Sequence, residues 1–311
     1  MSTSVPVPGA TLVDAESVRR HRAALLALIG ATVAVSVSAI LIREAGSDAA
    51  TVVWLRMALA VGLLAPWALP QLRRGAVGGS RRDVLLVALA GGLLAVHFLT
   101  WTASLAYTSV AASVLLVSLH PLIVAPLGAR LHGDAIHTRM IAGIALALCG
   151  TVVTCAGGLG AGGRALEGDL LALAGGVALA GYLLIGRARR DRGGVAGYSA
   201  VVYAVVSAAA AGAATVGGSL HAPSLRTLIA CLGLAAICTV GGHTVFNWTL
   251  RRLPASTVSL SFLGEPPLAA LLALLILGQP LTLPTVAGGV LILAGLATSL
   301  RSVPAMPVDH P

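Results

Sequence analysis

Apolar runs of about 20 residues dominate the chain, and short segments that carry its arginines separate them. A helix needs about 20 mainly apolar residues to cross the hydrocarbon core of a bilayer. Only 10% of the residues are charged, against about 25% in a typical soluble domain. Inside a bilayer the backbone must satisfy its own hydrogen bonds, so such runs form helices. The sequence therefore predicts an all-α polytopic membrane protein.

The apolar runs predict ten transmembrane helices joined by short connections. A disordered cytoplasmic tail is expected at 1–22, and a second cytoplasmic tail at 301–311. The expected spans are 23–42, 50–70, 84–106, 109–130, 136–157, 169–187, 196–217, 226–247, 256–277 and 282–300.

The arginines are distributed asymmetrically among the connecting segments. With the N-terminus inside, sixteen of the 20 basic residues fall in inside segments, three in outside loops, and one, Arg56, within a span. This is the positive-inside pattern, and it predicts a protein of the cell (cytoplasmic) membrane with both termini cytoplasmic. The net charge of +9 therefore indicates topological anchors rather than a nucleic-acid site.

The chain contains an internal repeat. A shift of 145 residues without gaps places Pro121 on Pro266, Gly143 on Gly288 and Gly150 on Gly295. Small residues on one helix face allow close contact between helices. The alternative is that these are generic packing glycines.

The repeat divides the chain into two five-helix halves, 23–157 and 169–300, joined by a Gly-rich loop at 158–168. Because five is odd, the second half enters the membrane in the opposite orientation. Such inverted repeats are common in secondary transporters, whose substrate site lies near the midplane between the halves.

Glu265 lies near the middle of the apolar run 256–277, directly before Pro266 and Pro267. A carboxylate at bilayer depth is costly and usually faces a water-filled cavity or a partner. The prolines remove backbone donors, so they break the helix where it lies against protein or a cavity. We expect Glu265 to bind a substrate or a coupling ion; the alternative is that it caps the freed backbone donors.

His120 is the counterpart of Glu265 on the same shift, and it precedes Pro121, the third expected helix-breaking proline. A pseudo-two-fold axis brings such equivalent positions toward one cavity. His120 is therefore expected to share a proton with Glu265 or to bind an anionic group when charged. The alternative is a hydrogen-bonded core histidine.

Arg56 is the arginine that falls within a span. Its guanidinium offers a bidentate fork, which suits a carboxylate substrate or a counter-charge for Glu265. The alternative is that it extends to the outer interface.

Aromatic and polar side chains at helical spacing on the third and eighth spans are the remaining candidates. Pockets for small molecules are lined by aromatic residues and a few polar groups, whereas core packing is the alternative. These residues are His97, Trp101, His243, Phe246 and Asn247.

Four stretches resemble EamA-type members of the drug/metabolite transporter superfamily: 54–60, 103–112 with Pro121, 168–173, and 264–266 with 277–280. The resemblance covers about residues 23–300. Where that family often has Glu after the glycine that ends helices four and nine, this chain has Asp134 and Gln279. The resemblance implies export of a small metabolite or drug by alternating access, driven by an ion gradient, often of protons.

We therefore expect a secondary active transporter in the lipid bilayer that exports a small molecule, with proton antiport as the expected coupling. The alternatives are an intramembrane enzyme that uses the histidines and Glu265, or a membrane scaffold. The chain has no lysine, HExxH or GxSxG pattern, and its histidines lack metal-ligand spacing within any one helix. No catalytic residue, metal or cofactor is expected, and a homodimer is left open.

Overall fold

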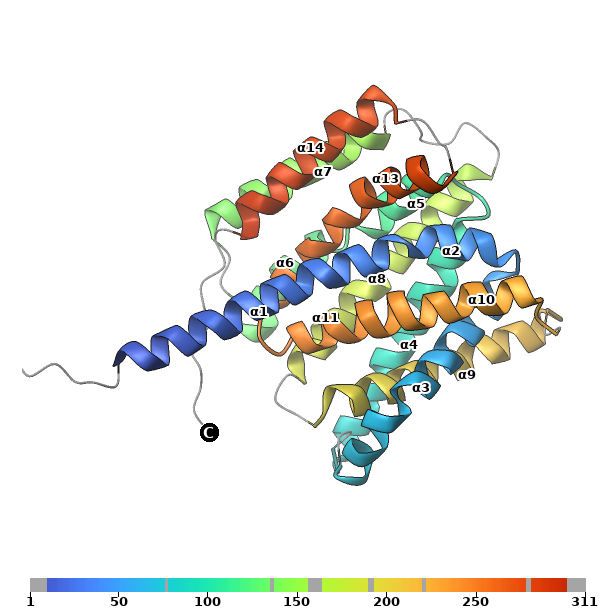
Figure 1. The fold of residues 1–311 in the computed structure, drawn as a ribbon, viewed down its shortest axis with the longest axis horizontal. Helices are drawn as coiled ribbons and strands as arrows, with labels where there is room; N and C mark the ends of the chain where they lie inside the picture. Colours follow the sequence, from blue (N-terminus) through green and yellow to red (C-terminus); the bar gives the residue numbers. More distant parts are fainter. Residues whose placement is uncertain are drawn as a thin grey trace, which may run out of the picture.

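The computed structural model describes residues 10–75, 78–134, 137–155, 164–189, 193–219, 222–277 and 281–300 of the chain. All regular elements within these ranges are helical, and they form one bundle (Figure 1). The elements are α1 (Ala10–Ser36), α2 (Ser38–Ala45), α3 (Ala49–Arg73), α4 (Arg81–Ser104), α5 (Val110–Val117), α6 (Pro121–His132), α7 (Thr138–Cys155), α8 (Ala165–Ala188), α9 (Val195–Val216), α10 (Leu225–Gly233), the π-helix η1 (Leu234–His243), α11 (Thr244–Thr249), α12 (Ala255–Ser261), the 3-10 turn η2 (Phe262–Gly264), α13 (Glu265–Leu277) and α14 (Leu283–Leu300).

Eight stretches of the described chain are long and apolar enough to cross a membrane. They correspond to eight of the ten expected spans. The fifth and tenth expected spans fall on α7 and α14, whose apolar parts, Thr138–Val153 and Val286–Ser299, are shorter. Each of these helices has 18 residues, which gives a length of about 27 Å, slightly less than the hydrocarbon core. The all-α polytopic class is thus confirmed, and length alone identifies eight spans rather than ten.

The expected tails and joint fall partly outside the described residues. Residues 1–9, 158–163 and 301–311 lie there. Residues 10–22 were expected in a disordered tail, but α1 begins at Ala10. The reason is composition, because Ala, Leu, Glu and Arg in this stretch favour a helix that continues into the first span.

Short polar residues set where several helices begin. The side chain of Asp48 accepts a hydrogen bond from the Thr51 backbone N–H (3.0 Å) and caps α3. Ser80, Ser109 and Ser224 cap α4, α5 and α10 in the same way. These bonds satisfy amides of the first turn, which have no partner inside the helix.

Two expected spans are interrupted near mid-length. The span at 109–130 consists of α5 and α6, and α6 begins at Pro121. The span at 256–277 consists of α12, η2 and α13, and Pro266 and Pro267 lie in the first turn of α13. Proline is tolerated there because first-turn amides lack an intrahelical partner. The two interruptions lie at equivalent positions of the two halves.

The main helix pairs join one half of the chain to the other. Helix α3 packs on α9, α4 on α8, α1 on η1, and α7 on α14. When each span is exchanged for its counterpart in the other half, the same set of pairs results. For example, the pair of the third and sixth spans (α4 and α8) becomes the pair of the eighth and first spans (η1 and α1). The contacts thus have the pattern of an approximate two-fold relation between the halves.

Helices α7 and α14 lie side by side at one edge of the bundle (Figure 1). A Cβ atom added to Gly150 would lie 2.6 Å from the Gly288 carbonyl oxygen, and one added to Gly295 would lie 2.5 Å from that of Gly143. The glycines paired by the 145-residue shift therefore form one interface, in which the two helices run antiparallel.

Candidate functional site

A small cavity lies where α1, α2, α4, α5, α8 and η1 meet the two helix interruptions. Five of the side chains singled out in the sequence line it. They come from both halves of the chain and are all buried: His97, Trp101, His120, His243 and Glu265.

Glu265 is the first residue of α13, directly after the 3-10 turn η2. The residue is only 5% exposed, yet it lines the cavity. Its carboxyl group has no ion pair or hydrogen bond with any residue that the structure describes. It therefore does not cap the backbone beside the prolines, and the N-terminal end of α13 favours a negative charge at this point.

His120 occupies the equivalent place before α6, and its Nδ1 lies 3.0 Å from the carbonyl oxygen of Val117. A carbonyl only accepts, so Nδ1 carries the proton and Nε2 of the neutral ring is an acceptor. That Nε2 is buried without a hydrogen-bond partner among the described residues. His120 thus presents an unused acceptor in the neighbourhood of Glu265.

Aromatic rings form a continuous wall around the cavity. The ring of His97 stacks on Trp101 with centroids 5.9 Å apart, and it lies 6.3 Å from the ring of His243. Phe262 lies 6.2 Å from His243 and meets His120 edge-on at 5.1 Å. The wall therefore runs from α4 through η1 to both helix interruptions.

Hydrogen bonding orients the His97 ring within this wall. Its Nδ1 lies 3.0 Å from the carbonyl oxygen of Gly175 on α8. A Cβ at position 175 would come within 3.3 Å of the backbone of His97 and of the Trp101 side chain. The glycine thus permits the close approach of α4 and α8 that this bond requires.

His243 is the last residue of the π-helix η1. A π-helical turn holds one residue more per turn than an α-helix, so it changes the face on which the following side chains lie, and it occurs frequently at functional sites. No local sequence signal marks this feature, and the expected regular helix at 226–247 did not include it.

Arg56 of α3 is 1% exposed, so it does not extend to the membrane interface. Its Nε donates to Thr239 Oγ1 at 2.7 Å, and its guanidinium carbon lies 4.4 Å from the centre of the Phe98 ring. Within the described part of the chain, its two Nη atoms have no partner and no ion pair joins it to Glu265. Arg56 is therefore a buried cation behind the aromatic wall rather than a lining residue.

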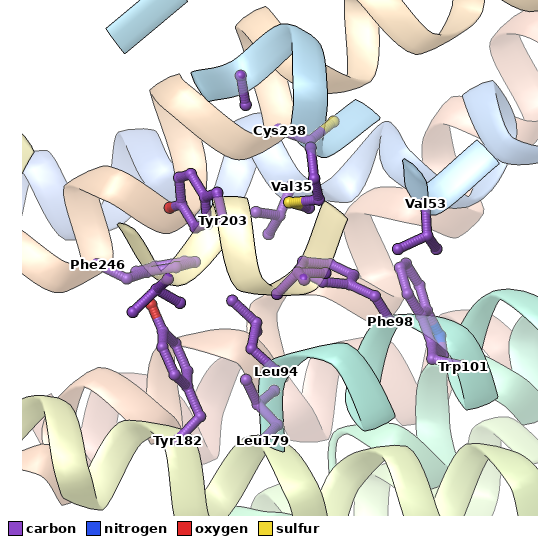
Figure 2. Close-up of a cluster of buried hydrophobic side chains, with 14 of the residues drawn as sticks. Val35, Val53, Leu94, Phe98, Trp101, Leu179, Tyr182, Tyr203, Cys238 and Phe246 are labelled. Carbon is purple, nitrogen blue, oxygen red and sulfur yellow. The ribbon is translucent and has the colours of Figure 1, made fainter. Parts of the chain in front are cut away.

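Phe246 and Asn247 do not line the central cavity. Phe246 packs against Phe262 with ring centroids 4.3 Å apart. Asn247 accepts from the Tyr182 hydroxyl at 2.6 Å and donates to Ser199 Oγ at 3.0 Å. Figure 2 shows Tyr182 and Phe246 in the same buried cluster as Phe98 and Trp101. These two candidates support the packing around the site.

One residue that lines the cavity, Phe262, was not singled out in the sequence. It belongs to an apolar run, in which a cavity-lining phenylalanine has the same pattern as a core phenylalanine. Phe262 lies three residues before Glu265, and this short spacing is the one feature that points to it.

Two buried ion pairs lie at the end of the helix bundle that carries most of the arginines. We call this end of the bundle the arginine-rich end. Arg187 bonds Asp134 at 3.2 Å, and Arg189 bonds Asp83 at 2.7 Å. Asp134 also accepts from the backbone N–H of Ala255 at 3.1 Å. These pairs hold the end of α8 against α4 and against the segments before α7 and α12.

No group of three His, Cys, Asp or Glu side chains in the described ranges is placed to hold a metal ion. The rings of His97 and His243 lie 6.3 Å apart, and His97 and His120 each place Nδ1 3.0 Å from a backbone carbonyl oxygen.

The sequence model of the EamA-like transporter family matches the chain twice, over residues 22–156 and 166–301. The chain belongs to the EamA-like transporter family. Each match covers one of the two halves, so the division seen in the glycine and proline pairs coincides with two EamA units. The resemblance seen in the sequence motifs is confirmed, and the chain is a multi-pass membrane protein of a transporter family.

Solved structures share this EamA fold. One chain, described as "Crystal structure of protein", is 20% identical, with a TM-score of 0.73 over 89% of this chain and 98% of that one. No curated protein sequence matches significantly. At this identity the likeness concerns the fold alone. Each of the two EamA units contributes two of the four ionisable residues that line the cavity: His97 and His120 from the first, His243 and Glu265 from the second.

Proposed function

We propose that this EamA protein is a secondary active transporter that exports a small metabolite or drug across the cell membrane by proton antiport. The observation that carries the proposal is the position of Glu265. It is the acidic residue that lines the cavity between the two EamA units. An ionisable residue within a membrane, beside a cavity, is by default a residue of the transport pathway.

The proposed architecture has ten spans, with α7 and α14 as the short fifth and tenth, in two oppositely inserted halves. The antiparallel contact of these equivalent helices supports that arrangement. Both termini are proposed to be cytoplasmic, because the arginine-rich end then faces inside. Discontinuous helices at the repeat interface are where such transporters hold their substrates.

Proton coupling is assigned to Glu265 because its carboxyl group has no fixed partner among the described residues. Antiport requires that proton and substrate exclude each other at one site. A carboxyl that is free to bind either a proton or a polar substrate group meets this requirement, whereas one held in an ion pair does not. His120, with its unused Nε2, is the proposed second binding group.

Arg56 is proposed to set the charge of the site from behind the aromatic wall. A guanidinium stays protonated throughout the physiological range, and the positive charge of Arg56 acts on both Glu265 and His243. It therefore offsets an ionised Glu265 at a distance and disfavours a second fixed cation in the cavity. A substrate is thus expected to present polar or single-cationic groups to Glu265.

The test uses purified protein in vesicles loaded with a metabolite mixture, under an imposed pH gradient. Mass spectrometry identifies the compound that moves in the wild type. Glu265→Gln keeps the size and polarity of the side chain but removes its ionisation. We expect this variant to lose uphill transport while it retains exchange of the same compound down its own gradient. Wild-type rates with an unchanged pH dependence would remove Glu265 from the coupling.

A further inference from the structure

Two ion pairs join the first EamA unit to the second at opposite ends of the bundle. At the arginine-rich end, Arg189 after α8 bonds Asp83 in the first turn of α4 at 2.7 Å. At the other end, where α2 and α10 lie side by side (Figure 1), Arg226 of α10 bonds Glu44 of α2 at 2.6 Å. Helix α9 crosses the bundle between the end of α8 and the start of α10. We call these contacts the Asp83 pair and the Glu44 pair.

The internal repeat relates the two pairs. The 145-residue shift places Glu44 on Arg189, and it places Arg81, the first residue of α4, on Arg226. Asp83 lies two residues after Arg81, in the same helical turn. Each pair thus connects the end of one helix with the first turn of another at equivalent places, but with the charges reversed. The two pairs are therefore counterparts across the approximate two-fold relation between the units.

The two pairs differ in their environment. The side chains of Arg189 and Asp83 are 3% and 7% exposed, whereas those of Arg226 and Glu44 are 67% and 47% exposed. Opposite charges attract each other more strongly where water is excluded, and an ion pair in contact with water contributes little. Separating the Glu44 pair therefore costs much less than separating the Asp83 pair.

A second buried contact adds to this difference. Asp134 of the first unit bonds Arg187 at 3.2 Å and accepts from the Ala255 backbone N–H at 3.1 Å, and both partners belong to the second unit. The 145-residue shift places Asp134 on Gln279 and Ile42 on Arg187. Neither Gln279 nor Ile42 can carry a charge, so the sequence does not repeat this ion pair at the opposite end.

We propose that the Asp83 pair and the Glu44 pair close the two ends of the transport path, and that the central cavity opens more readily toward the Glu44 pair. This inference rests on the proposed alternating access. Each pair joins the two units, so movement of one unit against the other at either end has to separate the pair there. With both termini cytoplasmic, the Glu44 pair faces outside, where an exporter that works by proton antiport takes up its proton.

The test measures from which end a water-soluble reagent reaches the cavity. Ser38 lines the cavity, and Ser38→Cys in a chain whose four cysteines are replaced by alanine gives a single reactive thiol. A membrane-impermeant maleimide is added to one side of sealed vesicles at a time. Vesicles that carry Ser47→Cys instead, exposed between α2 and α3, identify the side of the Glu44 pair. We expect Ser38→Cys to react at least about tenfold faster from that side.

Variants of the two pairs should act on different ends. Asp83→Asn deprives the buried Arg189 of the Asp83 carboxylate, and opening the arginine-rich end brings that guanidinium into water. Labelling of Ser38→Cys from this end should therefore rise by about tenfold or more. Glu44→Gln should raise labelling from its own end by less than about threefold, since the exposed pair contributes little.

Two controls accompany these variants. Glu167→Gln breaks another exposed ion pair, with Arg164 three residues away at the start of α8, and should leave both labelling rates unchanged. Val258→Cys places a thiol in the buried core, and it should stay unlabelled in the Asp83→Asn chain if that chain is folded. The comparison of the two ends with both pairs intact needs no charge variant, so it decides the matter even if Asp83→Asn does not fold.

Two results would overturn the proposal. One is labelling of Ser38→Cys that is equal from both ends, or faster from the arginine-rich end, while both pairs are intact. The other is a folded Asp83→Asn chain whose labelling from the arginine-rich end does not rise. The labelling requires neither substrate nor a pH gradient, so a failure of proton coupling leaves it intact. An absence of labelling from both ends would contradict alternating access itself, and with it this inference.

Discussion

At the scale of single residues, burial decides how much a charged side chain matters. The carboxylate of Asp134 and the guanidinium of Arg187 are 3% and 2% exposed, and Arg187 also donates to the Leu250 carbonyl oxygen at 3.0 Å. Removing one member of a buried ion pair leaves the other as an uncompensated buried charge. By contrast, the pair of Arg164 and Glu167 is exposed to solvent and is expected to contribute little.

Asp134→Asn should therefore destabilise the protein by about 3–5 kcal/mol, since the buried charge of Arg187 then loses the carboxylate of Asp134. The measurement is thermal or denaturant unfolding of the purified protein. Glu167→Gln is the control, because it removes a carboxylate from the exposed pair without leaving a buried charge. Equal stability of the two variants would contradict this account of the arginine-rich end.

Asp48 gives a residue-scale prediction that depends on pH. It lies outside the spans; its partial burial raises the pKa of its carboxyl, but hydrogen bonds from Thr51 and Ser219 outweigh burial and lower that pKa overall. The ionised cap therefore stabilises α3 above the unfolded pKa of about 3.9, and this stability is lost as the pH falls.

Asp48→Ala should cost about 1 kcal/mol near neutral pH, because the cap of α3 is lost. The difference from the wild type should shrink as the pH is lowered below about 4, the unfolded pKa, toward the lower folded pKa. Asp48→Asn keeps a side-chain oxygen as the cap at every pH, so its stability relative to Asp48→Ala should not vary with pH. A constant difference between wild type and Asp48→Ala would contradict the assigned role of the charge.

At the scale of elements, backbone contact between helices replaces side-chain interlocking at α7 and α14. A Cβ at Gly150 would meet the Gly288 carbonyl oxygen at 2.6 Å and the Ile292 nitrogen at 2.7 Å. Both atoms are backbone, so the helices themselves would have to separate.

Gly150→Ala should destabilise the protein by about 1–3 kcal/mol, the usual cost of overpacking. Gly212→Ala on α9 is the matched control, since its Cβ would meet nothing within 4 Å. There the better helix propensity of alanine should stabilise the protein by about 0.5–1 kcal/mol. The measurement is Tm in detergent, and a stabilising Gly150→Ala would show that α7 and α14 are not held in this contact.

At the scale of the whole molecule, the number of spans decides which side each loop occupies. With ten spans and the N-terminus inside, the joint at 158–163 lies outside and the segment after residue 300 lies inside. If α7 did not cross the bilayer, the joint would lie inside instead.

Reporter fusions distinguish these arrangements. Alkaline phosphatase, which is active only outside the cytoplasm, should be active when fused after residue 160 and inactive when fused after residue 300. A cytoplasmic fluorescent reporter should give the opposite pattern. An inactive phosphatase at residue 160 would contradict ten spans, and it would leave the fold with the eight helices that length alone identifies.

Much of the fold was predictable because the membrane restricts it. The apolar runs, the repeat spacing and the family resemblance led to the all-α class and the two EamA units, which the family matches confirm. The helical residues 10–22 and the π-helix η1 were not predictable from apolar pattern. The first depends on helix propensity beyond the bilayer, and the second on packing around His243.

The candidate site was predictable only in part. Glu265, His120, His97 and His243 carried a signal because polar groups at membrane depth are costly, and the structure places them around one cavity. Phe262 carried no polar signal of this kind, since an apolar residue has the same cost in a core and at a cavity wall. The ion pairs of Asp134 and Asp83 join residues far apart in the chain, so no local pattern connects them.

The sequence by itself determined that this chain is a bundle of membrane helices in two related halves. The physical reason is that the bilayer leaves the backbone no alternative to helices, and the arginines mark their ends. Only the tertiary structure decided which polar side chains share a space. Arg56 and Glu265 are both buried in the bundle, but one lies behind the aromatic wall and the other lines the cavity, because helix rotation and packing, rather than composition, determine where a side chain points.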